Sequence, residues 1–220
     1  MIRMRLAAYL HTQIAVVPLL AALAVLSVLY GGGQARAAEA YGMSAIVLFP
    51  VFAWQVKILL DVEPDVQRHI AITALGSRHR ELVNGLLAGA ATTCVTVLLG
   101  MVLPWAVGGV SADEGLALAE GLWVHLIAVP PAVALGAMAS RAISRTAGAG
   151  AMVLATGAVL AIVLGLRGFP APWLAPPLMS AARYVNTDGS LPQALGITAW
   201  ALAWTAAVLF GYSRLRRARP

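Results

Sequence analysis

Six long apolar runs, separated by short polar or basic connections, dominate the chain. A helix needs about 20 apolar residues to cross the hydrocarbon core of a bilayer. The runs that meet this need, the first of them somewhat short, are residues 14–30, 41–60, 82–105, 121–139, 146–166 and 194–212. Only helices or closed barrels can cross lipid, and these runs lack the alternation of barrel strands. The pattern therefore predicts an all-α, polytopic membrane protein with six transmembrane helices, in which residues 1–220 form a single transmembrane domain.

Composition supports lipid as the solvent of this chain. Hydrophobic residues make up 60% of it and charged residues only 11%, against roughly 25% charged residues in an ordinary soluble domain. The chain is rich in Ala, Gly, Leu and Arg and has a single lysine, Lys57. This bias hints at a GC-rich bacterial genome, and so at a bacterial cell (inner) membrane.

The basic residues predict the orientation. One side of the predicted topology carries 12 of the 15 basic residues: Arg3, Arg5, Lys57, Arg68, Arg78, Arg80, Arg141, Arg145, Arg214, Arg216, Arg217 and Arg219. The other side carries Arg36, Arg167 and Arg183. Because basic loops stay in the cytoplasm, the richer side is expected to be cytoplasmic, with both termini there. This topology explains the net charge of +6 better than nucleic-acid binding does.

The first span has a second interpretation. Arg3 and Arg5, an apolar run and the small residues around Ala37 are also typical of a signal peptide cleaved before Ala38. Cleavage would leave five spans and an external N-terminus. We favour an uncleaved span, because the apolar run is longer than a usual signal core.

The longest predicted cytoplasmic loop, residues 61–75, has the features of a short helix. Acidic residues and Pro64 come first and basic residues follow, which is the charge order that favours a helix dipole. Val66 and Ile70 share one face with Ala74, and Gly76-Ser77 then ends the helix. The segment is expected to lie across the cytoplasmic mouth, either as a plain connection or as a docking surface for a soluble partner. The N-terminal residues 1–13 form a second amphipathic candidate, suited to the lipid surface.

The external residues 167–193 are unusual because they are apolar yet broken by prolines. Residues 169–179 contain four prolines and Trp173. They are too interrupted to span, so they are expected to form short helical pieces that re-enter the outer membrane interface between spans five and six.

Small residues recur four apart at Gly85 and Gly89, and again in the pairs that begin at Gly136 and Gly157. Such faces allow close helix packing. They predict contacts within the bundle or, alternatively, the seam of a homodimer.

Motifs for catalysis are missing from the sequence. There is no His-Glu-x-x-His, the four histidines are scattered, and no Gly-x-Ser-x-Gly occurs. Lys57 lies between Val56 and Ile58, so a Walker-type nucleotide site is excluded. We therefore expect no catalytic or metal-binding residues and no cofactor on this chain. His125 is the one ionisable residue well inside a span, and it is expected to be either a hydrogen-bonded packing residue or a relay.

The whole pattern resembles the type-2 ABC exporter permeases. The closest local similarity runs from Glu63, at the head of the cytoplasmic helix, through Ser77-Arg78-His79-Arg80 to the small-residue segment 82–89. The resemblance covers the whole chain as architecture and about 30 residues as sequence.

The resemblance implies a function and partners. Two permease copies, as a homodimer or a related heterodimer, would pair in the membrane. A separate ABC ATPase subunit, which carries ATP and Mg, would dock on the short cytoplasmic helix of each copy. That helix would then act as the coupling helix between ATPase and membrane spans. This chain would then move a hydrophobic compound, peptide or lipid outward. The residues implied for ATPase coupling are Glu63, Pro64, Val66, Arg68, Ile70 and Leu75, and those suggested for the substrate path are Phe49, Phe52, Thr92, Thr96 and His125. The alternative is a secondary transporter or channel with no ATPase partner.

Overall fold

The computed structural model describes residues 2–110, 115–187 and 189–217, and its named elements are all helices. Ten are α-helices: α1 (Ile2–His11), α2 (Val16–Tyr30), α3 (Ala37–Val62), α4 (Asp65–Leu75), α5 (Arg78–Ala106), α6 (Gly115–Ala139), α7 (Arg141–Ser144), α8 (Ala147–Val163), α9 (Leu178–Tyr184) and α10 (Leu191–Arg217). Two 3-10 turns, Gln13–Ala15 and Pro172–Leu174, complete the described elements. The predicted all-α class is confirmed.

Five helical segments are long and apolar enough to cross a membrane. They are Gln13–Tyr30, Ala37–Val62, Arg78–Ala106, Ala117–Ser144 and Leu191–Arg217. The remaining predicted span, residues 146–166, forms the 17-residue helix α8. At 1.5 Å per residue, α8 is about 26 Å long, a little less than a hydrocarbon core of about 30 Å. The chain thus has five candidate membrane spans by length and apolar character, as expected of a membrane protein, and the sixth stays a prediction.

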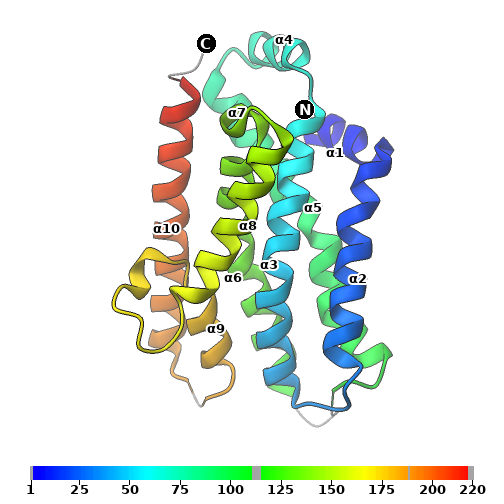
Figure 1. The fold of residues 1–220 in the computed structure, drawn as a ribbon, viewed down its shortest axis with the longest axis vertical. Helices are drawn as coiled ribbons and strands as arrows, with labels where there is room; N and C mark the ends of the chain where they lie inside the picture. Colours follow the sequence, from blue (N-terminus) through cyan, green and yellow to red (C-terminus); the bar gives the residue numbers. More distant parts are fainter. Residues whose placement is uncertain (1, 111–114, 188, 218–220) are drawn as a thin grey trace.

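The observed helices extend beyond the predicted spans at their polar ends. Helix α3 continues past residue 60 to Val62, and α10 continues past residue 212 to Arg217. Apolar runs mark only the hydrocarbon thickness, whereas a helix can continue into the headgroup region with its charged residues. Figure 1 shows α1 and α4 at the end of the bundle where α10 also ends.

Helices α3 and α6 form the centre of the bundle. In each, 67% of the most apolar 18-residue stretch is buried inside the protein, against 11% in α10. Helix α3 packs on α2, α5, α6, α8 and α9, so it touches most of the other spans. Its bulky buried residues Tyr41, Leu48, Phe49 and Phe52 fill the space between these neighbours. Any movement of α3 must therefore displace the helices around it.

The predicted small-residue faces pack inside the bundle. A Cβ on Gly136 would lie 2.5 Å from the backbone oxygen of Ala53, and one on Gly157 would meet the side chain of Leu135. On α5, a Cβ on Gly85 would meet the guanidinium of Arg5, and one on Gly89 would meet Val56. These glycines therefore serve close packing within one chain, and a seam between two copies would have to use other surfaces.

The proline-rich segment folds back on one end of the bundle as short helical pieces. The Trp204 indole donates a 2.9 Å hydrogen bond to the carbonyl of Leu174, and Arg183 of α9 donates one of 3.2 Å to the carbonyl of Gly165. The rings of Tyr184 and Trp123 pack with centroids 5.1 Å apart. The predicted local conformation thus agrees with the structure, while re-entry into the membrane stays a prediction.

Candidate functional site

Helix α4 stands at the end of the bundle and has sharply defined ends. Pro64 is its N-cap, and Gly76 ends it in the left-handed conformation with φ of 66°. Ser77 then caps α5, and its hydroxyl accepts a 3.2 Å hydrogen bond from the amide of His79. Among the described helices, only α5 has backbone contact with α4. The helix is therefore held along one side and at its two ends, and its other sides are open.

Two large aliphatic side chains of α4 are exposed. Val66 is 71% exposed and Ile70 is 64% exposed, although both are large aliphatic residues. Burying each such side chain would gain roughly 1.5–3 kcal/mol. Ile70 also lines an open groove of about 470 Å³ between α4, α1 and the end of α3, together with Met4 and Ala71. This surface can accept an apolar side chain from another molecule.

The six predicted coupling residues differ in their exposure. Pro64, Val66 and Ile70 are exposed, whereas Glu63, Arg68 and Leu75 are half-buried. Glu63 was expected to lead the helix, but it lies outside α4 as the C-cap of α3, in extended conformation. The extended backbone that Pro64 imposes on the preceding residue explains this difference.

A buried ion-pair cluster lies directly beneath the two ends of α4. Nη2 of Arg5 is 2.5 Å from Oε2 of Glu63 and 2.8 Å from Oε1 of Glu81. The side chains of Arg5, Glu63 and Glu81 are only 7%, 12% and 3% exposed. Since Glu63 precedes α4 and Glu81 follows it, one guanidinium holds together the two connections of α4 with the membrane helices.

The second oxygen of Glu81 binds the last helix. Nη2 of Arg216 lies 2.7 Å from Oε2 of Glu81. The cluster therefore links α1, the end of α3, the start of α5 and the end of α10. Removing one partner of a buried ion pair typically costs about 3–5 kcal/mol, because the other charge remains desolvated. The cluster thus makes this end of the bundle rigid.

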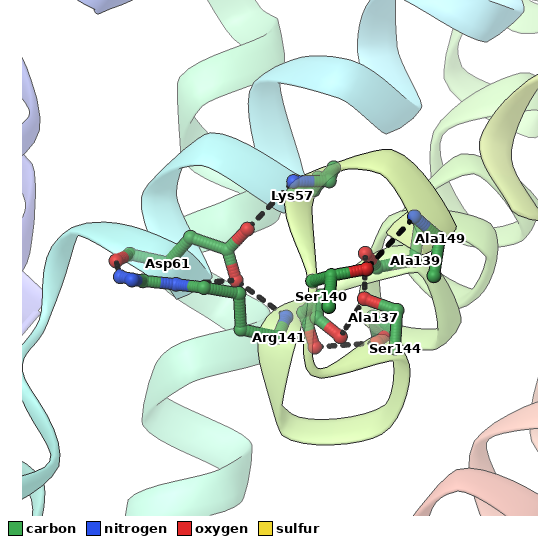
Figure 2. Close-up of polar contacts among 9 residues, drawn as sticks. Lys57, Asp61, Ala137, Ala139, Ser140, Arg141, Ser144 and Ala149 are labelled. Carbon is green, nitrogen blue, oxygen red and sulfur yellow. Dashed lines mark hydrogen bonds and ion pairs between the residues drawn. The ribbon is translucent and has the colours of Figure 1, made fainter. Parts of the chain in front are cut away.

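A second polar cluster joins α3 to the α6–α7–α8 connection (Figure 2). Lys57 donates a 2.7 Å hydrogen bond to Oδ2 of Asp61, and Oδ1 of Asp61 accepts a 2.7 Å bond from the amide of Arg141. The Arg141 guanidinium donates to the backbone carbonyl of Asp61. Ser144 donates to the carbonyls of Ala139 and Ser140. These bonds close the tight turn and fix it to the end of α3.

The five predicted substrate-path residues all lie in the bundle interior, none more than 7% exposed. Thr96 Oγ1 accepts a 2.7 Å hydrogen bond from Gln55 Nε2, which joins α5 to α3. His125 of α6 lies 3.1 Å from the hydroxyl of Ser44 and 2.7 Å from the carbonyl of Gly121. Both ring nitrogens of His125 are thus engaged. Phe49 and Phe52 are fully buried in α3 between these polar contacts.

Sequence reasoning missed the roles of Arg5, Glu81, Gln55 and Asp61. A signal was present for two of them. Arg5 stands three residues after Ile2 and four before Tyr9, on the apolar face of its helix. Glu81 stands four before Gly85, at the start of the small-residue face. A charge on a face that must be buried indicates a buried partner.

Within the described residues, no three His, Cys, Asp or Glu side chains gather to hold a metal ion. Comparisons with protein-family models, curated proteins and solved structures found no match, so the function has to be inferred from the chain's own geometry.

Proposed function

We propose that this chain is the membrane-spanning permease subunit of an ABC exporter and that α4 is its coupling helix. The observation that carries the proposal is the exposure of Val66 and Ile70 on a helix that stands outside the bundle. A helix that presents large aliphatic residues beyond the membrane helices is suited to a groove on a soluble partner. The partner proposed is a separate ATPase subunit, which would hydrolyse ATP with Mg.

The ion-pair cluster provides a route by which movement of α4 reaches the spans. Glu63 lies at the end of α3 and Glu81 at the start of α5, and Arg5 binds both. A displacement of α4 would therefore pull α3 and α5 as a unit. Arg216 would carry the same displacement to α10. An exporter needs such a connection, because its energy is released on another chain.

The buried polar pairs mark where a path for substrate would open. The hydrogen bond between Gln55 and Thr96 bridges α3 and α5, and the contact between Ser44 and His125 bridges α3 and α6. Separation of these helices would expose Phe49 and Phe52 together with the polar groups. A lining of this kind suits a hydrophobic compound, a peptide or a lipid, which would be moved outward.

The proposed topology has six crossings and both termini in the cytoplasm of a bacterial cell. In support, α1 and the end of α10 meet at Glu81. Helix α8 would complete a sixth crossing, and the proline-rich segment and α9 would be re-entrant pieces. In support, α9 packs against α3 and α6. A second permease copy would pair through outward faces, since the glycine faces are occupied within the chain.

Co-purification with an ATP-binding subunit tests the proposal against its rival, a secondary transporter or channel. If the chain is an exporter subunit, such an ATPase associates with it and α4 is required. If the chain works as a secondary transporter or channel, transport persists without an ATPase.

A further inference from the structure

A cavity of about 290 Å³ lies between α4, the start of α5 and the end of α10, on the side of α4 away from the 470 Å³ groove. The charged residues and the histidine that line it are Arg68, Arg78, His79, Glu81, Arg216 and Arg217. Helices α5 and α10 have no backbone contact in the described part of the chain. The cavity therefore opens in a gap that the Arg216–Glu81 ion pair bridges.

The cavity has an excess of positive charge. Among the described residues that line it, four are arginines and Glu81 is the one acidic residue. Both oxygens of that carboxylate are already engaged, Oε1 by Arg5 and Oε2 by Arg216. Cations gathered in a confined space repel each other, and a bound anion would relieve this repulsion. Guanidinium groups are especially suited to phosphate, which they bind through paired hydrogen bonds.

Apolar surface lies within two helical turns of the cavity. Phe210 of α10 is 61% exposed, and Val83 and Leu87 of α5 are 38% and 54% exposed. The Arg214 guanidinium lies over the Phe210 ring, 4.8 Å from its centroid. This cation–π contact sets a charged group directly beside exposed apolar surface, as is typical of the boundary between lipid tails and headgroups. The cavity thus lies at the level where lipid tails give way to headgroups.

We propose that this cavity binds a phosphate group and that the group belongs to an anionic phospholipid, whose acyl chains lie against the exposed residues of α5 and α10. Basic pockets at the ends of transmembrane helices bind anionic headgroups in this manner. Because α4 forms one wall of the cavity, the bound lipid would hold α4 against α5 and α10. The inference concerns lipid binding and does not depend on an ATPase partner.

The test is native mass spectrometry of the intact protein in neutral detergent, with phosphatidylglycerol, cardiolipin or phosphatidylcholine added. The double variant R78Q/R217Q removes two exposed arginines that line the cavity. The matched control R3Q/R80Q removes two exposed arginines at the same end of the bundle that do not line it. We expect wild type and control to retain anionic lipid over phosphatidylcholine, and R78Q/R217Q to bind it about tenfold more weakly or worse.

A soluble ligand is distinguished by a second measurement, calorimetric titration of the delipidated protein with pyrophosphate. Binding of pyrophosphate without retention of anionic lipid would support the phosphate site but assign it to a soluble molecule. Retention of anionic lipid that R78Q/R217Q weakens supports the lipid assignment. If wild type and R78Q/R217Q bind both probes equally, or wild type binds neither, the proposal is overturned. Circular dichroism spectra of both variants serve as the control that they remain folded.

Discussion

Arg216 of α10 donates a 2.7 Å hydrogen bond to Glu81, the first acidic residue of α5. The two residues are 135 positions apart, and the backbones of their helices do not approach each other closely in the described structure. The same carboxylate accepts a hydrogen bond from Arg5. Glu81 is therefore the point at which the first and last helices are tied to the connection that carries α4.

Replacement of Glu81 by Gln tests how much this cluster stabilises the bundle. The substitution leaves Arg5 with Glu63 alone and Arg216 without a carboxylate. We expect a loss of about 3 kcal/mol, which lowers Tm by roughly 6–12 °C in a chain of this size. Tryptophan fluorescence during heating in detergent gives Tm. The control is E39Q, on an exposed acid in the first turn of α3, and an equal small effect of both variants would contradict the prediction.

Asp61 is expected to hold the α6–α7 turn through its Oδ1 atom. D61A removes the acceptor for the Arg141 amide and the partner of Lys57, so it should destabilise the turn by about 2 kcal/mol. D61N keeps an acceptor oxygen for the Arg141 amide, so its loss of stability should be roughly half that of D61A. The rate of trypsin cleavage after Arg141 or Arg145 in inside-out vesicles reports opening of the turn. Equal cleavage rates for D61A and D61N would show that the hydrogen bond to Arg141 is unimportant.

Two glycine-to-alanine substitutions should differ in their effect on the stability of the fold. G136A places a Cβ 2.5 Å from the carbonyl of Ala53, so α6 must move away from α3, and we expect a cost of about 1–3 kcal/mol. G211A on α10 meets nothing within 4 Å and should be neutral or stabilise by up to about 1 kcal/mol, because alanine favours a helix. Both are measured by thermal unfolding. A stabilised G136A would disprove the close approach of α3 and α6.

The six-crossing topology predicts a defined labelling pattern. In a C94A background, cysteines placed at Gly32, Gly108, Arg167 or Asp188 should react with an impermeant maleimide from outside intact cells. Cysteines at Gln67, Ser144 or Pro220 should react only after permeabilisation. The pair at Ser144 and Arg167 decides whether the short helix α8 crosses. Labelling of both cysteines from the same side would reduce the number of membrane crossings to five. In a separate test, mass spectrometry that finds Ala38 as the first residue would show that the first span is cleaved.

The sequence predicted the helices well because one-dimensional signals determine them. Apolar length marked the spans, and Gly76 with Ser77 marked the end of α4, since glycine readily adopts a left-handed conformation and serine caps the next helix. The length of α8 was overestimated, because residues 164–166 are apolar yet leave the helix in turns. Hydropathy measures apolar character and does not fix where a helix ends.

The ion-pair cluster could not be predicted in the same way. Arg5 and Glu81 are 76 residues apart, and their meeting depends on how α1 folds over the ends of α3 and α5. The pairing of Gln55 with Thr96 likewise depends on the packing of two helices. The distribution of basic residues predicted that Arg5 and Arg216 lie on the same side of the membrane. Only the tertiary structure shows that they converge on one carboxylate.

The role of α4 as the coupling helix is tested most directly by V66D/I70D, which places two charges on its exposed apolar surface. Desolvating such charges costs several kcal/mol, so docking should weaken by at least about a hundredfold. The matched control A7D/L10D puts two charges on exposed positions of α1 at the same end of the bundle. All three proteins should insert into the membrane in equal amounts.

The measurement is the amount of ATP-binding subunit that co-purifies with each protein, together with its substrate-stimulated ATP hydrolysis. We predict that wild type and A7D/L10D retain the subunit and its stimulated activity, and that V66D/I70D loses both. Retention of both at wild-type levels by V66D/I70D would contradict the assignment of α4, and the failure of any ATPase to associate with wild type would contradict the exporter function itself.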